Sequence, residues 1–135
     1  MASAISGGCL CGKVRYEISS DPAMAAHCYC GDCRRVTGSA MASVMLVPKD
    51  DFHLTKGELK YFSMKGDSGN EISRGFCANC GSGILAKLAM PMVAVKAGSL
   101  DDPSRFNPQM NIFKSSAPAW APMNSTLHSF DKGPS

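Results

Sequence analysis

Seven cysteines in tight clusters constrain this chain more than any other feature of its sequence. They form a C-x-C pair, a C-x-C-x-x-C triplet and a C-x-x-C pair, which are Cys9 and Cys11, then Cys28, Cys30 and Cys33, then Cys77 and Cys80. An odd number of thiols cannot pair completely as disulfides within one chain, and cysteines that serve only as small apolar core residues would not cluster in this way. The clustering therefore favours metal binding over disulfide or redox chemistry.

The spacing predicts how the sulfurs divide between two ions. If Cys9 and Cys11 lie in a strand, their side chains point to the same face, with Cα atoms roughly 6.6 Å apart. Cys77 and Cys80 form a C-x-x-C knuckle, a turn that presents two sulfurs to zinc. Neither pair can complete a tetrahedral site alone. We therefore expect the two pairs to share one closed, structural ion.

The middle triplet supplies three ligands by itself. We expect Cys28 and Cys30 on one face of a strand, with Cys33 following across a short turn at residues 31–32. Three sulfurs on a tetrahedral ion leave one position for water or substrate, which is typical of a catalytic site. The alternative pairs Cys28 and Cys30 with the downstream knuckle, and it requires the triplet to split. Tetrahedral thiolates suit zinc, with an iron–sulfur cluster as the second possibility.

The remaining composition narrows the class of protein. The length of 135 residues fits one domain, and the net charge of +3 comes from scattered residues, without a block of like charge that would bind nucleic acid. The longest apolar stretch, residues 40–47, is too short to span a membrane. The N-terminus lacks the basic start and apolar run of a secretory signal. We therefore expect a cytoplasmic protein that binds neither nucleic acid nor membranes.

Short apolar runs, separated by Gly, Pro, Asn and Asp, predict a mainly β fold. Strands are predicted at residues 13–18, 25–30, 42–47, 52–54, 59–62, 72–76, 83–88 and 93–97. No long segment keeps a helical period, and residues 34–39 are predicted to form a connecting turn. The expected architecture is one zinc-stapled domain of short antiparallel strands over residues 5–125, followed by a C-terminal tail over 126–135.

Three cysteine motifs carry a family resemblance. The segments GCLCGKVRY (8–16), HCYCGDCRR (27–35) and FCANCGS (76–82) resemble the glutathione-dependent formaldehyde-activating enzyme family, which includes the centromere protein V domain. Shorter matches are TGS (37–39), AGSLDDP (97–103) and APAW (117–120), so that the resemblance covers roughly residues 5–120. Asn111 stands where a histidine is common in the family, and Ala119 separates Pro118 from Trp120.

The resemblance implies a β-rich fold with two zinc ions in each chain. It implies a structural ion held by Cys9, Cys11, Cys77 and Cys80, and a catalytic ion held by Cys28, Cys30 and Cys33. It further implies a carbon–sulfur lyase resembling S-(hydroxymethyl)glutathione synthase, which adds a small thiol such as glutathione to formaldehyde or a related small aldehyde. Arg34 or Arg35 would then hold a substrate carboxylate through paired hydrogen bonds. The alternative function is a non-catalytic zinc module that binds a protein or carries a thiol.

Overall fold

The computed structural model of the chain describes residues 4–133, and their fold is mainly β, as the sequence predicts. Eleven described strands are joined by one α-helix and several short 3₁₀ turns. The first strands are β1 (Ile5–Gly8), β2 (Arg15–Ile18), β3 (Met24–Cys28), β4 (Ala42–Pro48), β5 (Phe52–Lys56) and β6 (Leu59–Lys65). They are followed by β7 (Glu71–Cys77), β8 (Gly83–Lys87), β9 (Met92–Lys96), β10 (Met110–Ile112) and β11 (His128–Ser129). The helix is α1 (Gly31–Thr37).

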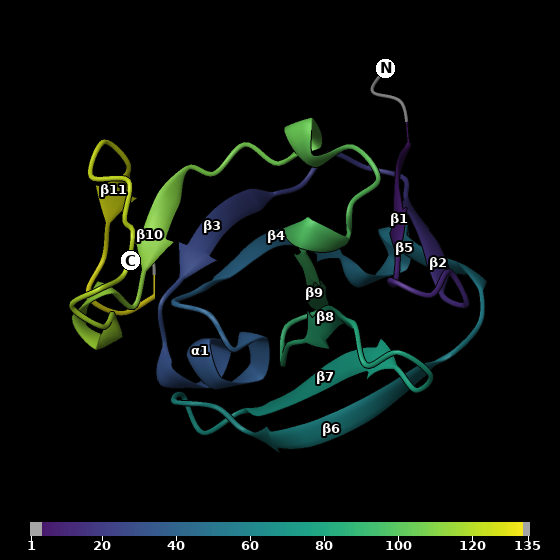
Figure 1. Cartoon of the computed structure of the whole chain (residues 1–135), viewed down its shortest axis with the longest axis horizontal. Helices are drawn as coiled ribbons and strands as arrows, with labels where there is room; N and C mark the ends of the chain where they lie inside the picture. The colour runs from purple at the N-terminus through teal and green to yellow at the C-terminus, as the bar shows by residue number, and fades with distance from the viewer. Residues whose placement is uncertain (1–3, 134–135) are drawn as a thin grey trace.

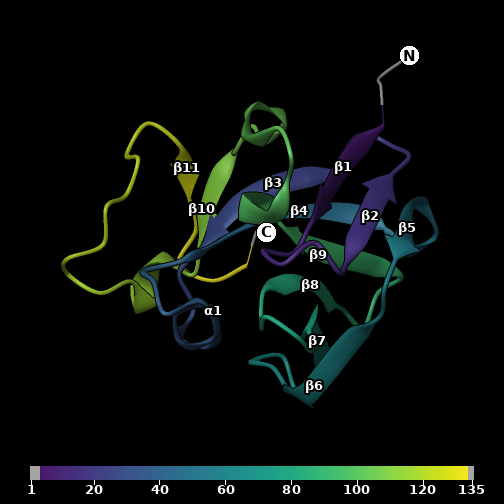
Figure 2. The same cartoon turned by 45° about the vertical axis from the view of Figure 1, so that its right-hand side comes forward.

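The strands form two sheets. The small sheet has the order β1-β2-β5, and the large sheet has the order β11-β10-β3-β4-β9-β8-β7-β6. All pairs are antiparallel except those of β10, which runs parallel to both β3 and β11. Figures 1 and 2 show the small sheet at one end of the molecule and β10 with β11 at the other. No helix within residues 4–133 has the length and apolar character needed to span a bilayer.

The main core lies between the two sheets. Alternate side chains of β2 and β4 point into it, because successive residues of a strand face opposite sides. The buried apolar side chains of this core come from Ile5, Val14, Tyr16, Ile18, Met45, Val47, Ile84, Leu85, Val93, Val95 and Leu100. Full burial of one such large side chain stabilises the fold by about 1.5–3 kcal/mol. The core also contains Cys9 and Cys77, so that one group of sulfurs lies against the best-packed part of the protein.

The opposite face of the large sheet carries small side chains and the helix α1. Ala42, Val44, Ala86 and Ala94 form a second apolar cluster, and Cys33 of α1 packs against it. Small residues on this face leave room for a helix to lie close to the sheet. The middle cysteine triplet therefore lies against this face of the large sheet, next to β3, β4 and β9.

The helix α1 differs from the predicted strand and turn. The strand β3 ends at Cys28, and Cys30 is the N-cap of α1, with its Sγ accepting a hydrogen bond from the backbone N–H of Cys33 at 3.2 Å. Gly38, with φ of 68°, ends the helix in the left-handed conformation that favours glycine. Seven residues give only two helical turns, which is too short for a periodic apolar pattern to stand out.

Most predicted strands occur with shifted ends, while three strands were not predicted. These are β1, which ends in two glycines, and the short strands β10 and β11. Glycine-rich strands and strands of two or three residues give little alternating pattern to recognise. β11 pairs with β10 from within the segment that we expected to be a tail. The division at residue 125 stays a prediction, and residues 134–135 of that tail lie outside the described part of the chain.

Candidate metal centres and a neighbouring cavity

Four sulfurs meet where the N-terminal turn approaches the end of β7. The Sγ atoms of Cys9, Cys11, Cys77 and Cys80, here called the four-cysteine cluster, all lie within 4.8 Å of one another. The separations are 3.6 Å for Cys9–Cys11 and 3.8 Å for Cys11–Cys77. With zinc–sulfur bonds of about 2.3 Å, tetrahedral geometry places sulfurs about 3.8 Å apart. The donor set therefore fits a tetrahedral ion with four thiolate ligands.

Tight turns, not a strand, present these sulfurs, which corrects our expectation for Cys9 and Cys11. β1 ends at Gly8, and the chain turns at once, with the N–H of Gly12 donating to the carbonyl of Cys9 at 3.2 Å. Gly12 has φ of 81°, which only glycine adopts without strain. The knuckle ends in the same way, since the N–H of Gly81 donates to the carbonyl of Cys77 at 2.8 Å. Two glycine-containing turns, and not the alternation of a strand, therefore bring the four sulfurs together.

Hydrogen bonds prepare the four-cysteine cluster to carry negative charge. The backbone N–H of Val14 donates to the Sγ of Cys9 at 3.2 Å. The Ser82 hydroxyl lies 3.2 Å from the Sγ of Cys80, and its hydrogen bond lowers the pKa of Cys80 to about 5. Thiolates, and not thiols, are the form that binds metal ions.

The second group of sulfurs is the triplet Cys28, Cys30 and Cys33, here called the three-cysteine cluster. Its Sγ atoms also lie within 4.8 Å of one another, and within residues 4–133 no further cysteine, histidine or carboxylate joins the group. Cys28 comes from the end of β3, Cys30 from the N-cap of α1, and Cys33 from the first turn of α1. The grouping of the sulfurs is that of the sequence prediction, although Cys30 lies beyond the end of the strand. The three side chains can hold one metal ion and leave a position for another ligand.

The close packing of the three sulfurs makes their ionisation interdependent. The hydrogen bond between Cys28 and Cys30 raises the pKa of Cys28 and lowers the pKa of Cys30. Neighbouring thiolates repel one another, so that a proton or a cation has to be shared among them. Ile112 and Phe113 belong to the apolar cluster that contains these three cysteines. Three clustered thiolates are ligands that a soft or borderline metal ion prefers.

Polar residues next to the triplet in sequence occupy different surroundings. His27 lies on the face of β3 opposite to Cys28, where its Nδ1 lies 2.8 Å from the Ser43 hydroxyl and its ring meets Phe106 edge-on. Arg34 is half-buried, whereas Arg35 is exposed. Neither arginine is among the residues that line the cavity described next, and their predicted contact with substrate stays a prediction.

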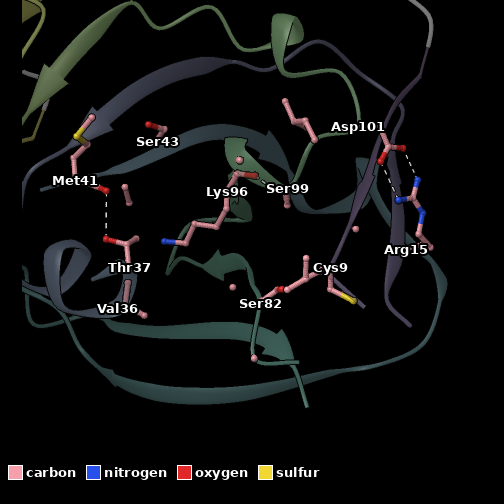
Figure 3. A pocket seen from close by; sticks show the side chains of 17 residues that line it. Cys9, Arg15, Val36, Thr37, Met41, Ser43, Ser82, Lys96, Ser99 and Asp101 are labelled. Atoms are coloured by element: carbon pink, nitrogen blue, oxygen red, sulfur yellow. Dashed lines mark hydrogen bonds and ion pairs between the residues drawn. The ribbon is translucent and has the colours of Figure 1, made fainter. Parts of the chain in front are cut away.

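A cavity of about 840 Å³ borders the four-cysteine cluster. Cys28, Cys30 and Cys33 do not line it, but Ala42, the register partner of Cys28, does. Its wall includes Cys9 and Ser82 from the four-cysteine side and Val36 and Thr37 from the last turn of α1. The ends of β4 and β9 form its floor, and Figure 3 shows the Lys96 side chain crossing it toward Thr37. The cavity volume is within the usual range for a small-molecule site.

Lys96 is the cavity residue that sequence reasoning missed. It ends the apolar strand β9 and pairs in register with Val44, so that its side chain shares the helix-bearing face of the sheet. Burial lowers the pKa of Lys96, and the nearby sulfur of Cys33 acts in the opposite direction. The available sequence signal was a lysine directly after four apolar strand residues and directly before the family-like segment 97–103.

Comparisons with known proteins concern the family and the fold of the chain. The family described as glutathione-dependent formaldehyde-activating enzyme matches residues 4–116. No curated protein matches the chain. A crystal structure of a Rhodobacter sphaeroides protein has a similar fold, with a TM-score of 0.58 and 22% identity over 71% of this chain and 87% of that chain. The match over most of the chain shows that it belongs to the glutathione-dependent formaldehyde-activating enzyme family.

Proposed function

We propose that this chain is a zinc-dependent carbon–sulfur lyase that adds a small thiol, such as glutathione, to formaldehyde or a related small aldehyde. The observation that carries the proposal is the three-cysteine cluster, where three ligands come together and the described residues 4–133 supply no fourth. A site built only for stability is expected to be closed by four protein ligands, as the other cluster is. Membership of the family supports the same reaction type.

In this reaction the sulfur of the thiol bonds to the carbonyl carbon, and the carbonyl double bond becomes a C–O single bond. The proton that leaves the thiol is balanced by the proton that the new hydroxyl takes up. Zinc bound at the three-cysteine cluster would supply a Lewis acid that favours the deprotonated form of a coordinated thiol. The three cysteines would hold the ion, and Ile112 and Phe113 supply apolar packing on this side of the cluster.

We assign the four-cysteine cluster a structural role. Its ligands are separated by a long stretch of chain, since Cys77 lies 66 positions after Cys11. An ion held there would join the N-terminal turn to the knuckle after β7 and would therefore contribute directly to folding. Cys9, a buried member of this cluster, also lines the cavity.

The test compares the zinc-loaded protein with the variant Cys30→Ser. Thiols add to formaldehyde without a catalyst, so the rate of exchange between free and hydroxymethylated glutathione should be measured by NMR exchange spectroscopy at several protein concentrations. We expect the exchange rate to rise in proportion to the wild-type concentration and to fall to the uncatalysed value with Cys30→Ser. Metal analysis should find two zinc ions in each wild-type chain and one in the variant, with the circular dichroism spectrum retained.

Two results would contradict the proposal. An exchange rate independent of wild-type concentration would favour the non-catalytic zinc module. A wild-type content of one zinc ion per chain would remove the reactive centre altogether.

A further inference from the structure

Lys96 brings into the cavity a positive charge that no carboxylate of the described residues neutralises. Arg15 and Asp101 also line the cavity, but they bind each other, with Arg15 Nη1 donating to Asp101 Oδ1 at 2.9 Å. The Ser6 hydroxyl adds a second donor to Asp101, at 2.8 Å. Figure 3 shows this pair at the far side of the cavity, away from the Lys96 amino group. The charge available to a ligand is therefore that of Lys96.

The hydroxyl groups that line the cavity are engaged in internal hydrogen bonds. Ser43 Oγ lies 2.8 Å from the His27 ring nitrogen, and Ser99 Oγ lies 2.6 Å from the Tyr16 hydroxyl. Thr37 Oγ1 donates to the carbonyl of Cys33 at 2.8 Å. Among the described polar side chains that line the cavity, Lys96 is the one for which no hydrogen bond or ion pair is found.

The surroundings of Lys96 make an unpaired charge costly. The residue is half-buried, and on its face of the sheet the neighbouring side chains are Val44, Ala42 and Ala94. A lysine in such a setting loses part of its hydration, and among the described residues it has the sulfurs of the three-cysteine cluster nearby but no carboxylate in ion-pair contact. Binding of an anionic group there would restore the lost interaction as a charge-assisted hydrogen bond.

The position of Lys96 relative to the three-cysteine cluster fits a ligand that reaches both. Cys28 and Lys96 share one face of the large sheet, on strands β3 and β9 that flank β4. The sulfurs of this cluster are close enough to Lys96 to influence its pKa. Strands lie about 4.8 Å apart, so that β3 and β9 are separated by about 10 Å. This spacing joins the two strand backbones, and a short thiol with an acidic group several bonds from its sulfur has a similar length.

We propose that Lys96 is the anion-binding residue of this cavity and selects thiols that carry a carboxylate, with the carboxylate bound at Lys96 and the sulfur directed to the three-cysteine cluster. This inference rests on the proposed function for the direction of the sulfur. Its binding part stands independently, since it depends on Lys96 and on the anionic group alone. Neutral or cationic thiols of the same length are then poor ligands.

The experiment measures binding, not turnover. The probe is S-methylglutathione, which keeps both carboxylates but has a thioether in place of the thiol, and the comparison ligand is its diethyl ester. Binding to the zinc-loaded wild type, to Lys96→Met and to Lys96→Arg is followed by isothermal titration calorimetry. Lys60→Met is the matched control, since Lys60 is an exposed lysine on β6 outside the cavity.

We expect Lys96→Met to weaken binding of S-methylglutathione by about 10- to 100-fold, as for loss of one charge-assisted hydrogen bond. Lys96→Arg and Lys60→Met should bind within a few-fold of wild type, and the diethyl ester should bind wild type and Lys96→Met equally weakly. Equal affinity of wild type and Lys96→Met for S-methylglutathione would overturn the inference, as would no measurable binding to wild type. Weaker retention of zinc by Lys96→Met with unchanged probe affinity would also overturn it, because Lys96 would then only balance the charge of the thiolates.

The outcomes separate this inference from the proposed function. Probe binding that depends on Lys96, without acceleration of the thiol–aldehyde reaction, would retain the anion site and refute the lyase. Acceleration by wild type, with equal probe binding by Lys96→Met, would retain the lyase and refute the anion site. If both hold, Lys96→Met should raise the KM for glutathione more than it lowers kcat.

Discussion

An ion in the four-cysteine cluster should stabilise the protein about twice as much as an ion in the three-cysteine cluster, because it closes a much longer loop of the chain. The ligands Cys11 and Cys77 are 66 positions apart, whereas Cys28 and Cys33 are five apart. The chain-entropy relation for a cross-link gives about 4 kcal/mol for the longer loop and about 2 kcal/mol for the shorter one. A typical domain has a net free energy of unfolding of only about 5–15 kcal/mol, so that the first contribution is decisive.

Two double variants isolate these contributions. Cys11→Ser with Cys80→Ser removes two ligands of the four-cysteine cluster, and Cys30→Ser with Cys33→Ser does the same to the three-cysteine cluster. None of the four side chains is fully buried, so that the substitutions leave the core packing intact. Thermal unfolding should be followed by circular dichroism, with the zinc content measured on the same samples.

For a domain of this length, each kcal/mol changes the melting temperature by about 3–5 °C. We therefore expect Tm to fall by about 12–20 °C for the first double variant and by about 6–10 °C for the second. Equal decreases would refute the division into a structural and a reactive centre. A first variant that keeps both zinc ions and the wild-type Tm would refute the assignment of its ligands.

Two further predictions concern the contact between the small sheet and the turn after β9. Gly7→Ala should lower the free energy of unfolding by about 1–3 kcal/mol, measured by urea denaturation, because the new Cβ would overlap the Ser99 carbonyl and the Tyr16 hydroxyl. Burial raises the pKa of Tyr16 to about 12, compared with about 10 in the unfolded chain. The buried neutral hydroxyl therefore contributes fully to the free energy of unfolding below pH 10, and this contribution is lost as the pH rises through 12. Tyr16→Phe should therefore be about 1 kcal/mol less stable than wild type at pH 7, through loss of the hydrogen bond to Ser99, and the more stable protein at pH 12. A stability difference that does not change between pH 9 and pH 12 would contradict the buried state of this hydroxyl.

The sequence alone determined the fold class and the grouping of the sulfurs. Short alternating runs between turn residues were sufficient to predict a mainly β chain, because side-chain alternation is a local property of strands. Spacing was sufficient to separate a triplet from two pairs, because a tetrahedral ion admits four ligands and neither pair reaches that number. The family motifs pointed the same way, since they consist largely of these cysteines and their glycines.

Tertiary structure decided how the cysteines are presented and where a ligand can bind. The turn at Cys9–Gly12 and the cap at Cys30 depend on single hydrogen bonds and left-handed glycines, which a pattern of apolar residues does not encode. The cavity draws its wall from separate segments of the chain, and Lys96 enters it because strand register places this residue opposite Val44. Strand register and the approach of distant segments are fixed by packing of the whole core. The position of the Lys96 charge in the cavity could therefore be recognised only from the folded structure.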